Sequence, residues 1–184
     1  QVNNTNVPLW ELMMKNVYSL GTYGVDASTL EIDIRYRDPS SNNDINFLNA
    51  NGANDNVKNK RWLEIMDLDR LDNLQNPRPD GKYDIIEGQT IRLQNGKIYF
   101  PVLEPFGNKL RSEINNDAIA DTFAFDSLYD VSKFRAKNEF PTQNRFRIYA
   151  RYSSKSNVIN LNSFSIPRGA VTVTAGGRNL VEGI

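Results

Sequence analysis

Alternation of apolar and polar residues predicts two half-buried β-strands. In residues 29–37 the apolar positions are Leu30, Ile32, Ile34 and Tyr36, and charged residues stand between them. Residues 145–152 repeat the pattern with Phe146, Ile148, Ala150 and Tyr152. A period of two places one face of each strand in a core and the other in solvent. The outer positions of the second strand are basic and match acidic positions of the first, so we expect the two strands to pair.

A three- and four-residue spacing predicts two short helices. Residues 8–20 carry Leu9, Leu12, Met13, Val17 and Leu20, with Pro8 in the first turn and Gly21 as the stop. Residues 126–137 are expected to form a second helix capped by Asp126. Its apolar stripe is narrow, so this helix should lie on the surface of a sheet.

Further apolar runs are interpreted as strands: residues 61–66, 97–106, 158–165 and 170–174. Asn95-Gly96 before the second run and Gly176-Gly177 after the fourth are typical hairpin turns, because both tolerate positive φ. Residues 115–121 should add one helical turn. The pattern as a whole predicts a mainly β fold, an antiparallel β-sandwich or jelly-roll-like domain with two short surface helices.

Length and composition fit one globular domain. The chain has 184 residues, of which 39% are hydrophobic and 24% charged. We expect a soluble β-rich domain over residues 1–163 and the start of a truncated β-hairpin unit over residues 164–184, leading onward in a larger parent protein. The formal net charge is zero, which argues against nucleic-acid partners. No apolar run approaches the length of about 20 residues that a membrane-spanning helix needs, so the segment should not span a membrane.

The absence of histidine and cysteine excludes Ser-His-Asp and Cys-His nucleophiles, zinc sites built on those residues, and disulfides. Carboxylate, lysine, tyrosine and Ser-Lys chemistry stays open. Glu104 or Glu113 with Asp84 would supply a glycosidase pair, but nothing fixes their separation. The pair Ser132-Lys133 is equally unconstrained. We therefore expect no enzyme activity.

An acidic stretch offers oxygen ligands for a hard cation. Its carboxylates are Asp67, Asp69, Asp72, Asp80, Asp84 and Glu87. Calcium takes six to eight oxygens from a flexible loop, although this spacing is not that of an EF-hand. The alternative is a rigid structural turn in which backbone N–H groups and the nearby Arg70, Arg78 and Lys82 hold the carboxylates. Calcium is the only cofactor that the sequence suggests.

Several segments resemble one protein family, in the same order along the chain. They are residues 8–21 (PLWELMMKNVYSLG), 66–71 (MDLDRL), 79–84 (PDGKYD), 98–107 (IYFPVLEPFG), 116–120 (NDAIA) and 165–183 (SIPRGAVTVTAGGRNLVEG). Together they resemble the SprA (Sov) family of gliding-motility and type 9 secretion outer-membrane proteins. The match extends over nearly the whole chain, but none of its motifs is chemical. Members of the family are much longer than 184 residues.

The resemblance implies a non-catalytic soluble domain of a SprA-like translocon, serving protein export and gliding motility in a Gram-negative cell envelope. Its partners would be other parts of the parent outer-membrane barrel and secretion-system proteins. The strands lack the sustained lipid-facing alternation over about ten residues that a barrel wall requires. A calcium-stabilised cell-surface adhesion or carbohydrate-binding module is the alternative. Trp10 or Trp62 would suit glycans or peptides if exposed, although buried packing is the more common fate of a tryptophan.

Overall fold

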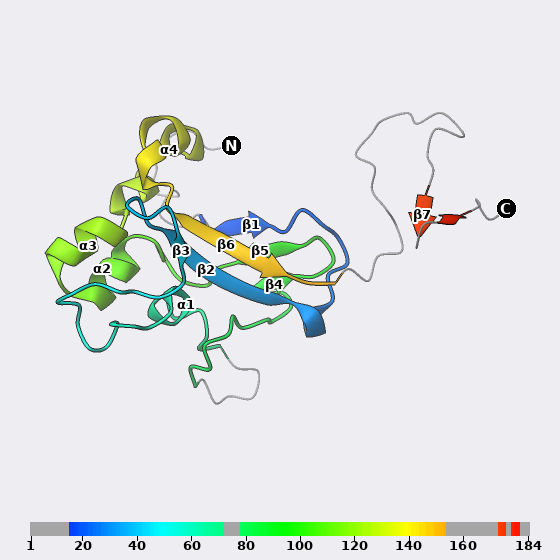
Figure 1. Cartoon of the computed structure of the whole chain (residues 1–184), viewed down its shortest axis with the longest axis horizontal. Coiled ribbons are helices and arrows are strands. Elements are labelled where there is room, and N and C mark those ends of the chain that lie inside the picture. Colours follow the sequence, from blue (N-terminus) through cyan, green and yellow to red (C-terminus); the bar gives the residue numbers. More distant parts are fainter. Residues whose placement is uncertain (1–14, 72–77, 154–172, 176–177, 181–184) are drawn as a thin grey trace.

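Two antiparallel strands form most of one three-stranded sheet. The computed structural model describes residues 15–71, 78–153, 173–175 and 178–180. In it, β2 (Glu31–Arg37) pairs with β6 (Phe146–Arg151), with Glu31 opposite Arg151 and Tyr36 opposite Phe146. The short β3 (Asp44–Ile45) pairs with the other edge of β2. Both alternation-based strands and their pairing are confirmed (Figure 1).

A second three-stranded sheet has the order β1 (Val17–Ser19), β5 (Lys97–Tyr99), β4 (Ile91–Arg92). Asn95-Gly96 connects β4 to β5, which confirms the predicted hairpin turn. Gly96 has φ of 57°, and a Cβ there would lie 2.2 Å from the carbonyl oxygen of Thr22. This position therefore requires glycine for both its backbone angle and its close contact.

The buried faces of both sheets contribute to one hydrophobic core, which includes Ile34 of β2 and Ile98 of β5. Trp62 packs among aromatic rings at one end of this core, with its ring 5.8 Å from Tyr36, 5.2 Å from Phe123 and 5.3 Å from Phe146. Its indole N–H donates to the carbonyl oxygen of Ile45. Strand β6 and the helices are thereby fixed to the same aromatic cluster.

Short helices complete the fold. They are η2 (Ala27–Thr29), α1 (Trp62–Ile65), α2 (Asn108–Ile114), α3 (Asp117–Phe123), η3 (Asp126–Tyr129), α4 (Lys133–Glu139) and η4 (Pro141–Gln143). Figure 1 shows α2 and α3 side by side at one end of the sheets. The predicted turn over residues 115–121 is confirmed as α3, whose first turn is capped by the Asn116 side chain accepting from the Ile119 N–H.

The predicted helix over residues 8–20 is wrong in its last part. Residues Val17–Ser19 are strand β1, and Val17 lies opposite Tyr99 of β5. Residues 8–14 lie outside the described part of the chain. The local apolar spacing suited a helix, but pairing with a strand some 80 residues away satisfies the backbone here instead.

The predicted strand over residues 61–66 is also wrong, because this segment contains α1. Four of its apolar side chains are buried: Trp62, Leu63, Ile65 and Met66. The segment therefore has no solvent-exposed face that an alternating pattern could indicate. The Glu64 carboxylate accepts from the backbone N–H of Arg61, which completes a capping box at the start of the helix.

Two other predicted elements have different bounds. The strand expected over residues 97–106 ends at Tyr99, and the chain then turns through Glu104, which has φ of 47°. The helix expected over residues 126–137 is divided into η3 and α4, and Ser132 caps α4 where Asp126 was predicted to do so. A break between these two helices lets the chain change direction at residues 130–132.

The C-terminal hairpin is confirmed as β7 (Val173–Ala175) paired with β8 (Arg178–Leu180), on either side of Gly176-Gly177. The strand predicted over residues 158–165 lies outside the described residues.

The structure confirms antiparallel sheets with short helices. Of the described residues, 26% are helical and 20% lie in strands, so the fold is not clearly all-β.

Candidate functional site

The acidic stretch at residues 67–87 folds as a set of turns in which most carboxylates have separate partners. Asp67 forms ion pairs with Arg70, at 2.8 Å, and with Lys109 of α2. Lys109 also contacts Glu113 at 2.7 Å. Arg70 is one of the cations that the sequence predicts to hold these carboxylates, whereas Lys109 is brought there only by the tertiary fold.

Backbone N–H groups hold the next carboxylates. Asp80 accepts from Lys82, Asp84 from Leu71 and Glu87 from Leu93. Asp72 lies outside the described residues. Within the described ranges no three acidic side chains lie together as a group that could hold a metal ion. The turn is therefore held, as far as it is described, by its own hydrogen bonds and ion pairs.

Asp69 differs from its neighbours because it is only 1% exposed. One carboxylate oxygen, Oδ2, accepts from the backbone N–H of Gly81 at 3.1 Å. The other, Oδ1, is buried and has no hydrogen-bond partner among the described residues. Burial raises the pKa of the Asp69 carboxyl, and the nearby Glu64 adds to this effect.

The residues considered for catalysis are engaged in local contacts. Glu104 accepts from the side chain of Asn108, and Glu113 pairs with Lys109. The Ser132 hydroxyl accepts from the Arg135 N–H at the start of α4. Trp62 is 1% exposed, which confirms the expected buried packing and leaves no exposed ring there for a glycan. Trp10 lies outside the described residues.

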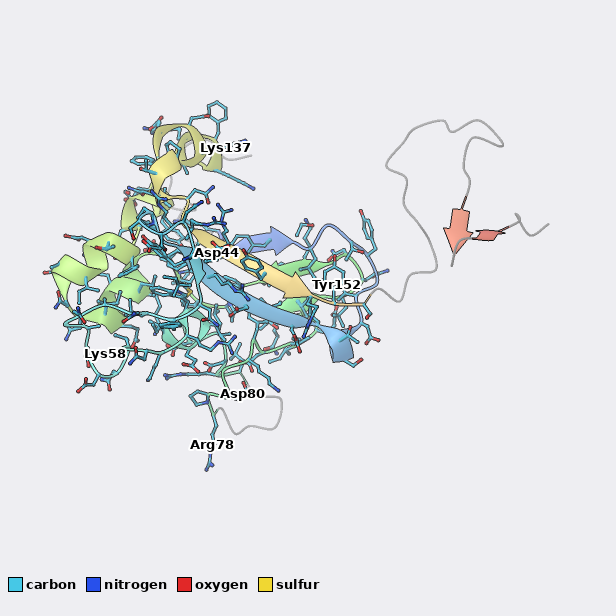
Figure 2. The ribbon with its side chains drawn as sticks, viewed as in Figure 1. Asp44, Lys58, Arg78, Asp80, Lys137 and Tyr152 are labelled. Atoms are coloured by element: carbon cyan, nitrogen blue, oxygen red, sulfur yellow. The ribbon has the colours of Figure 1, made fainter. Side chains whose placement is uncertain are left out.

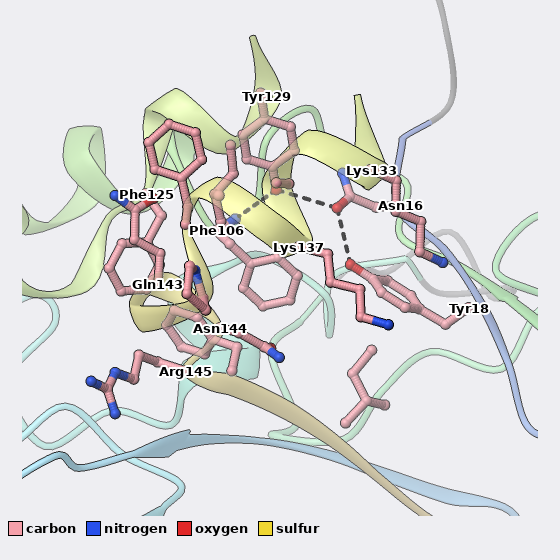
Figure 3. Close-up of a pocket in the computed structure, with 16 residues that line it drawn as sticks. Asn16, Tyr18, Phe106, Phe125, Tyr129, Lys133, Lys137, Gln143, Asn144 and Arg145 are labelled. Atoms are coloured by element: carbon pink, nitrogen blue, oxygen red, sulfur yellow. Dashed lines mark hydrogen bonds between the residues drawn. The ribbon is translucent and has the colours of Figure 1, made fainter. Parts of the chain in front are cut away.

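A cavity of about 590 Å³ lies beside α4, between η3, β6 and the start of β1 (Figure 3). Six aromatic residues line it: Tyr18, Phe106, Phe125, Tyr129, Phe140 and Phe146. This volume is in the range of small-molecule sites, which combine apolar walls with a few polar groups. The cavity is therefore the strongest candidate for a binding site in the described part of the chain.

A chain of hydrogen bonds fixes the polar wall of this cavity. The Phe106 N–H donates to the Tyr129 hydroxyl at 3.2 Å, and Tyr129 in turn donates to Oδ1 of Asn16 at 3.2 Å. The Tyr18 hydroxyl donates to the same oxygen at 3.1 Å. Burial raises the pKa of Tyr18 and of Tyr129 well above 10, so both hydroxyls keep their protons and remain donors.

The charged residues that line the cavity are all basic: Lys133 and Lys137 from α4, and Arg145 directly before β6. Three amide side chains, Asn16, Gln143 and Asn144, also line it, and the described lining includes no Asp or Glu. In a chain of zero net charge, this concentration of one sign favours an anionic ligand.

Sequence reasoning missed this cavity because its residues come from several elements and loops that lie far apart in the sequence. A partial signal was present: Lys133 and Lys137 stand four residues apart and so share a helix face, and Phe140 and Phe146 follow. The prediction of one continuous surface helix over residues 126–137 did not include the break between η3 and α4. Because of this break, α4 and β6 line the same cavity.

No protein-family model and no curated protein sequence matches this chain. In the described part of the chain, no helix has both the length and the apolar character needed to cross a bilayer.

Proposed function

We propose that the chain is a non-catalytic domain of a SprA-like outer-membrane translocon of the type 9 secretion system, serving protein export and gliding motility. The observation that carries the proposal is where the family-like segments lie. They supply Leu68, Tyr83, Ile98, Phe100 and Ala120, each 5% exposed or less, to one hydrophobic core.

Resemblance that includes core positions is what a shared scaffold would produce, because such residues determine packing and not chemistry. The two sheets contribute to the same core, which supports the finer proposal of a sandwich-like arrangement. The partners would be the rest of the parent barrel and other secretion-system proteins, in the outer-membrane region of the cell envelope. An apolar cavity and a well-packed scaffold suit binding.

In-frame deletion of residues 7–166 from the parent gene tests this role. We expect cargo export and gliding to fail while the parent protein still reaches the outer membrane, as measured by immunoblot of the membrane fraction. Normal export combined with a specific loss of surface attachment would contradict the proposal. It would favour the second candidate, a surface adhesion or carbohydrate-binding module.

The second candidate is a module stabilised by calcium, and Asp69 favours it. A buried carboxylate oxygen without a hydrogen-bond partner among the described residues is costly unless another group compensates it. Calcium would supply that compensation through a direct oxygen contact, with Asp67, Asp80, Asp84, Glu87 and Asp72 as the remaining acidic groups of the stretch.

A thermal melt tests calcium binding. A cation that binds only the folded chain raises the midpoint by mass action, so 1 mM added calcium should raise it by several degrees and chelator should reverse the shift. Asp69→Asn and Asp80→Asn should each abolish the calcium response. A midpoint indifferent to calcium and to chelator would leave the turn held by its own hydrogen bonds.

A further inference from the structure

The cavity beside α4 continues along the inner face of β6. A second cavity of about 460 Å³ lies between β6 and the β1–β5 pair. Tyr18, Phe146 and Ile148 line both cavities. The two spaces therefore adjoin and form one elongated groove, which we call the β6 groove, with α4 at one end and the edges of the two sheets along its length.

The two ends of the β6 groove differ in polarity. At the inner end, the wall is formed by uncharged side chains, including Leu20, Ile98 and Ala150. The Tyr152 hydroxyl donates to the carbonyl oxygen of Leu20 at 3.2 Å, which ties β6 to the chain after β1. The end beside α4 carries Lys133 and Lys137. The groove thus has one cationic end and one uncharged end.

The lysines at the cationic end have no ion pair or side-chain hydrogen bond within the described residues, in contrast to Arg135 on the same helix, which pairs with Glu139 at 2.8 Å. Figure 3 shows Lys137 extending toward Tyr18. Arg145 lines the same cavity. Unpaired cations beside an apolar wall match a ligand that brings its own negative charge.

Asn16 supplies a fixed donor at this end. It is 6% exposed, and its Oδ1 accepts from both Tyr18 and Tyr129. Those two hydroxyls determine the orientation of the amide, because Nδ2 cannot accept from them. The Nδ2 group has no hydrogen-bond partner in the described part of the chain and can donate to a ligand oxygen.

We propose that the β6 groove binds a free long-chain fatty acid, with the carboxylate between Lys133, Lys137 and Asn16 and the acyl chain along β6 between the sheets. A single anionic head with a long uncharged tail matches the one cationic end and the uncharged remainder. A peptide would instead bring a polar amide group at every residue into the uncharged end, where each would need a partner. This proposal rests on residues of the groove alone and is independent of the translocon.

Titration of the 184-residue chain with cis-parinaric acid, a fluorescent long-chain fatty acid, tests the proposal. We expect saturable binding of one molecule per chain and displacement by palmitate. Affinity should fall from palmitate to dodecanoate to octanoate, by up to about fourfold per methylene removed, because each methylene buries apolar surface. Hexadecanol, which has the tail without the charge, should bind at least about tenfold more weakly.

Replacing both groove lysines, in Lys133→Gln/Lys137→Gln, should weaken palmitate binding by about tenfold and leave hexadecanol binding unchanged. Both lysines are exposed, so the thermal midpoint should be retained. The matched control is Lys58→Gln/Lys60→Gln, which removes the same charge from exposed positions. Figure 2 shows Lys58 on the opposite side of the molecule from Lys137.

Three results would overturn the proposal. One is the absence of saturable binding, and another is equal affinity for palmitate and hexadecanol with no effect of the lysine variant. The third is displacement of the probe by an acidic, apolar-rich peptide at lower concentration than by palmitate, which would make the groove a peptide site. Failure of any of these binding tests leaves the translocon deletion result unaffected, so the two proposals fail separately.

Discussion

At the scale of single residues, Asp69 is the most consequential side chain of the acidic turn. It is 1% exposed and its pKa is raised by burial. The unfolded chain therefore loses this proton at lower pH than the folded chain does. The stabilisation that results is complete below the unfolded pKa and is lost as pH rises through the folded pKa. At neutral pH the ionised group opposes folding unless a cation compensates it.

Asp69→Asn should remove this cost, because the amide oxygen can still accept from the Gly81 N–H. In chelator at pH 7 we expect a melting midpoint above that of the natural chain. The difference should be smaller at pH 4, because lowering the pH toward the raised pKa of the natural carboxyl favours its protonated form. Asp80→Asn is the exposed comparison. A variant less stable than the natural chain at both pH values would show that the charge of Asp69 is needed by the fold.

The burial of single side chains was predictable in the strand where apolar and charged residues alternate. Leu30, Ile32, Ile34 and Tyr36 are all buried, as alternation indicated. Holding of the acidic side chains by backbone N–H groups was also foreseen, and Asp80 and Glu87 are examples. The ion pair of Asp67 with Lys109 joins residues 42 positions apart, and no local pattern carries that information.

At the scale of elements, strands with one solvent-exposed face were predictable from the sequence. Segments whose side chains are buried on every side were not. The pairs β2–β6 and β7–β8 and the turn at Gly96 follow from alternation and turn chemistry. Residues 61–66 have an almost continuous apolar run, in which helix and strand cannot be distinguished by period. The Glu64 carboxylate accepts a hydrogen bond from the Arg61 N–H, and this capping contact favours the helix.

Tertiary pairing explains the other misassigned element. Residues Val17–Ser19 pair with Lys97–Tyr99, so the chain at β1 is extended despite its helical spacing of apolar residues. The cavity beside α4 depends on the same fact, since Asn16 and Tyr18 lie in or next to this strand. A helix over residues 8–20 would have given no reason to place either side chain against α4. The misassigned element and the missed site therefore have one cause.

At the scale of the whole molecule, strand β6 connects the parts of the described fold. It pairs with β2 over six residues, and Phe146 packs against Trp62, Tyr36 and Phe106. The inner face of β6 also forms the groove between the two sheets. Strand β6 thus belongs at once to a sheet, to the aromatic cluster and to the candidate binding site.

The hydrophobic core of the described residues ends at Tyr152, which allows the predicted boundary at residue 163 to be tested by truncation. A chain that ends at residue 163 should keep a cooperative melt with its midpoint within about 2 °C of the full chain, since in a chain of this size about 1 kcal/mol shifts the midpoint by about 2–4 °C. A chain that ends at residue 144 should lose the cooperative transition, because β2 loses its partner and Trp62 loses the ring of Phe146. If the chain ending at residue 163 also fails to melt cooperatively, the C-terminal 21 residues are part of the folded unit. The boundary would then have to lie after residue 163.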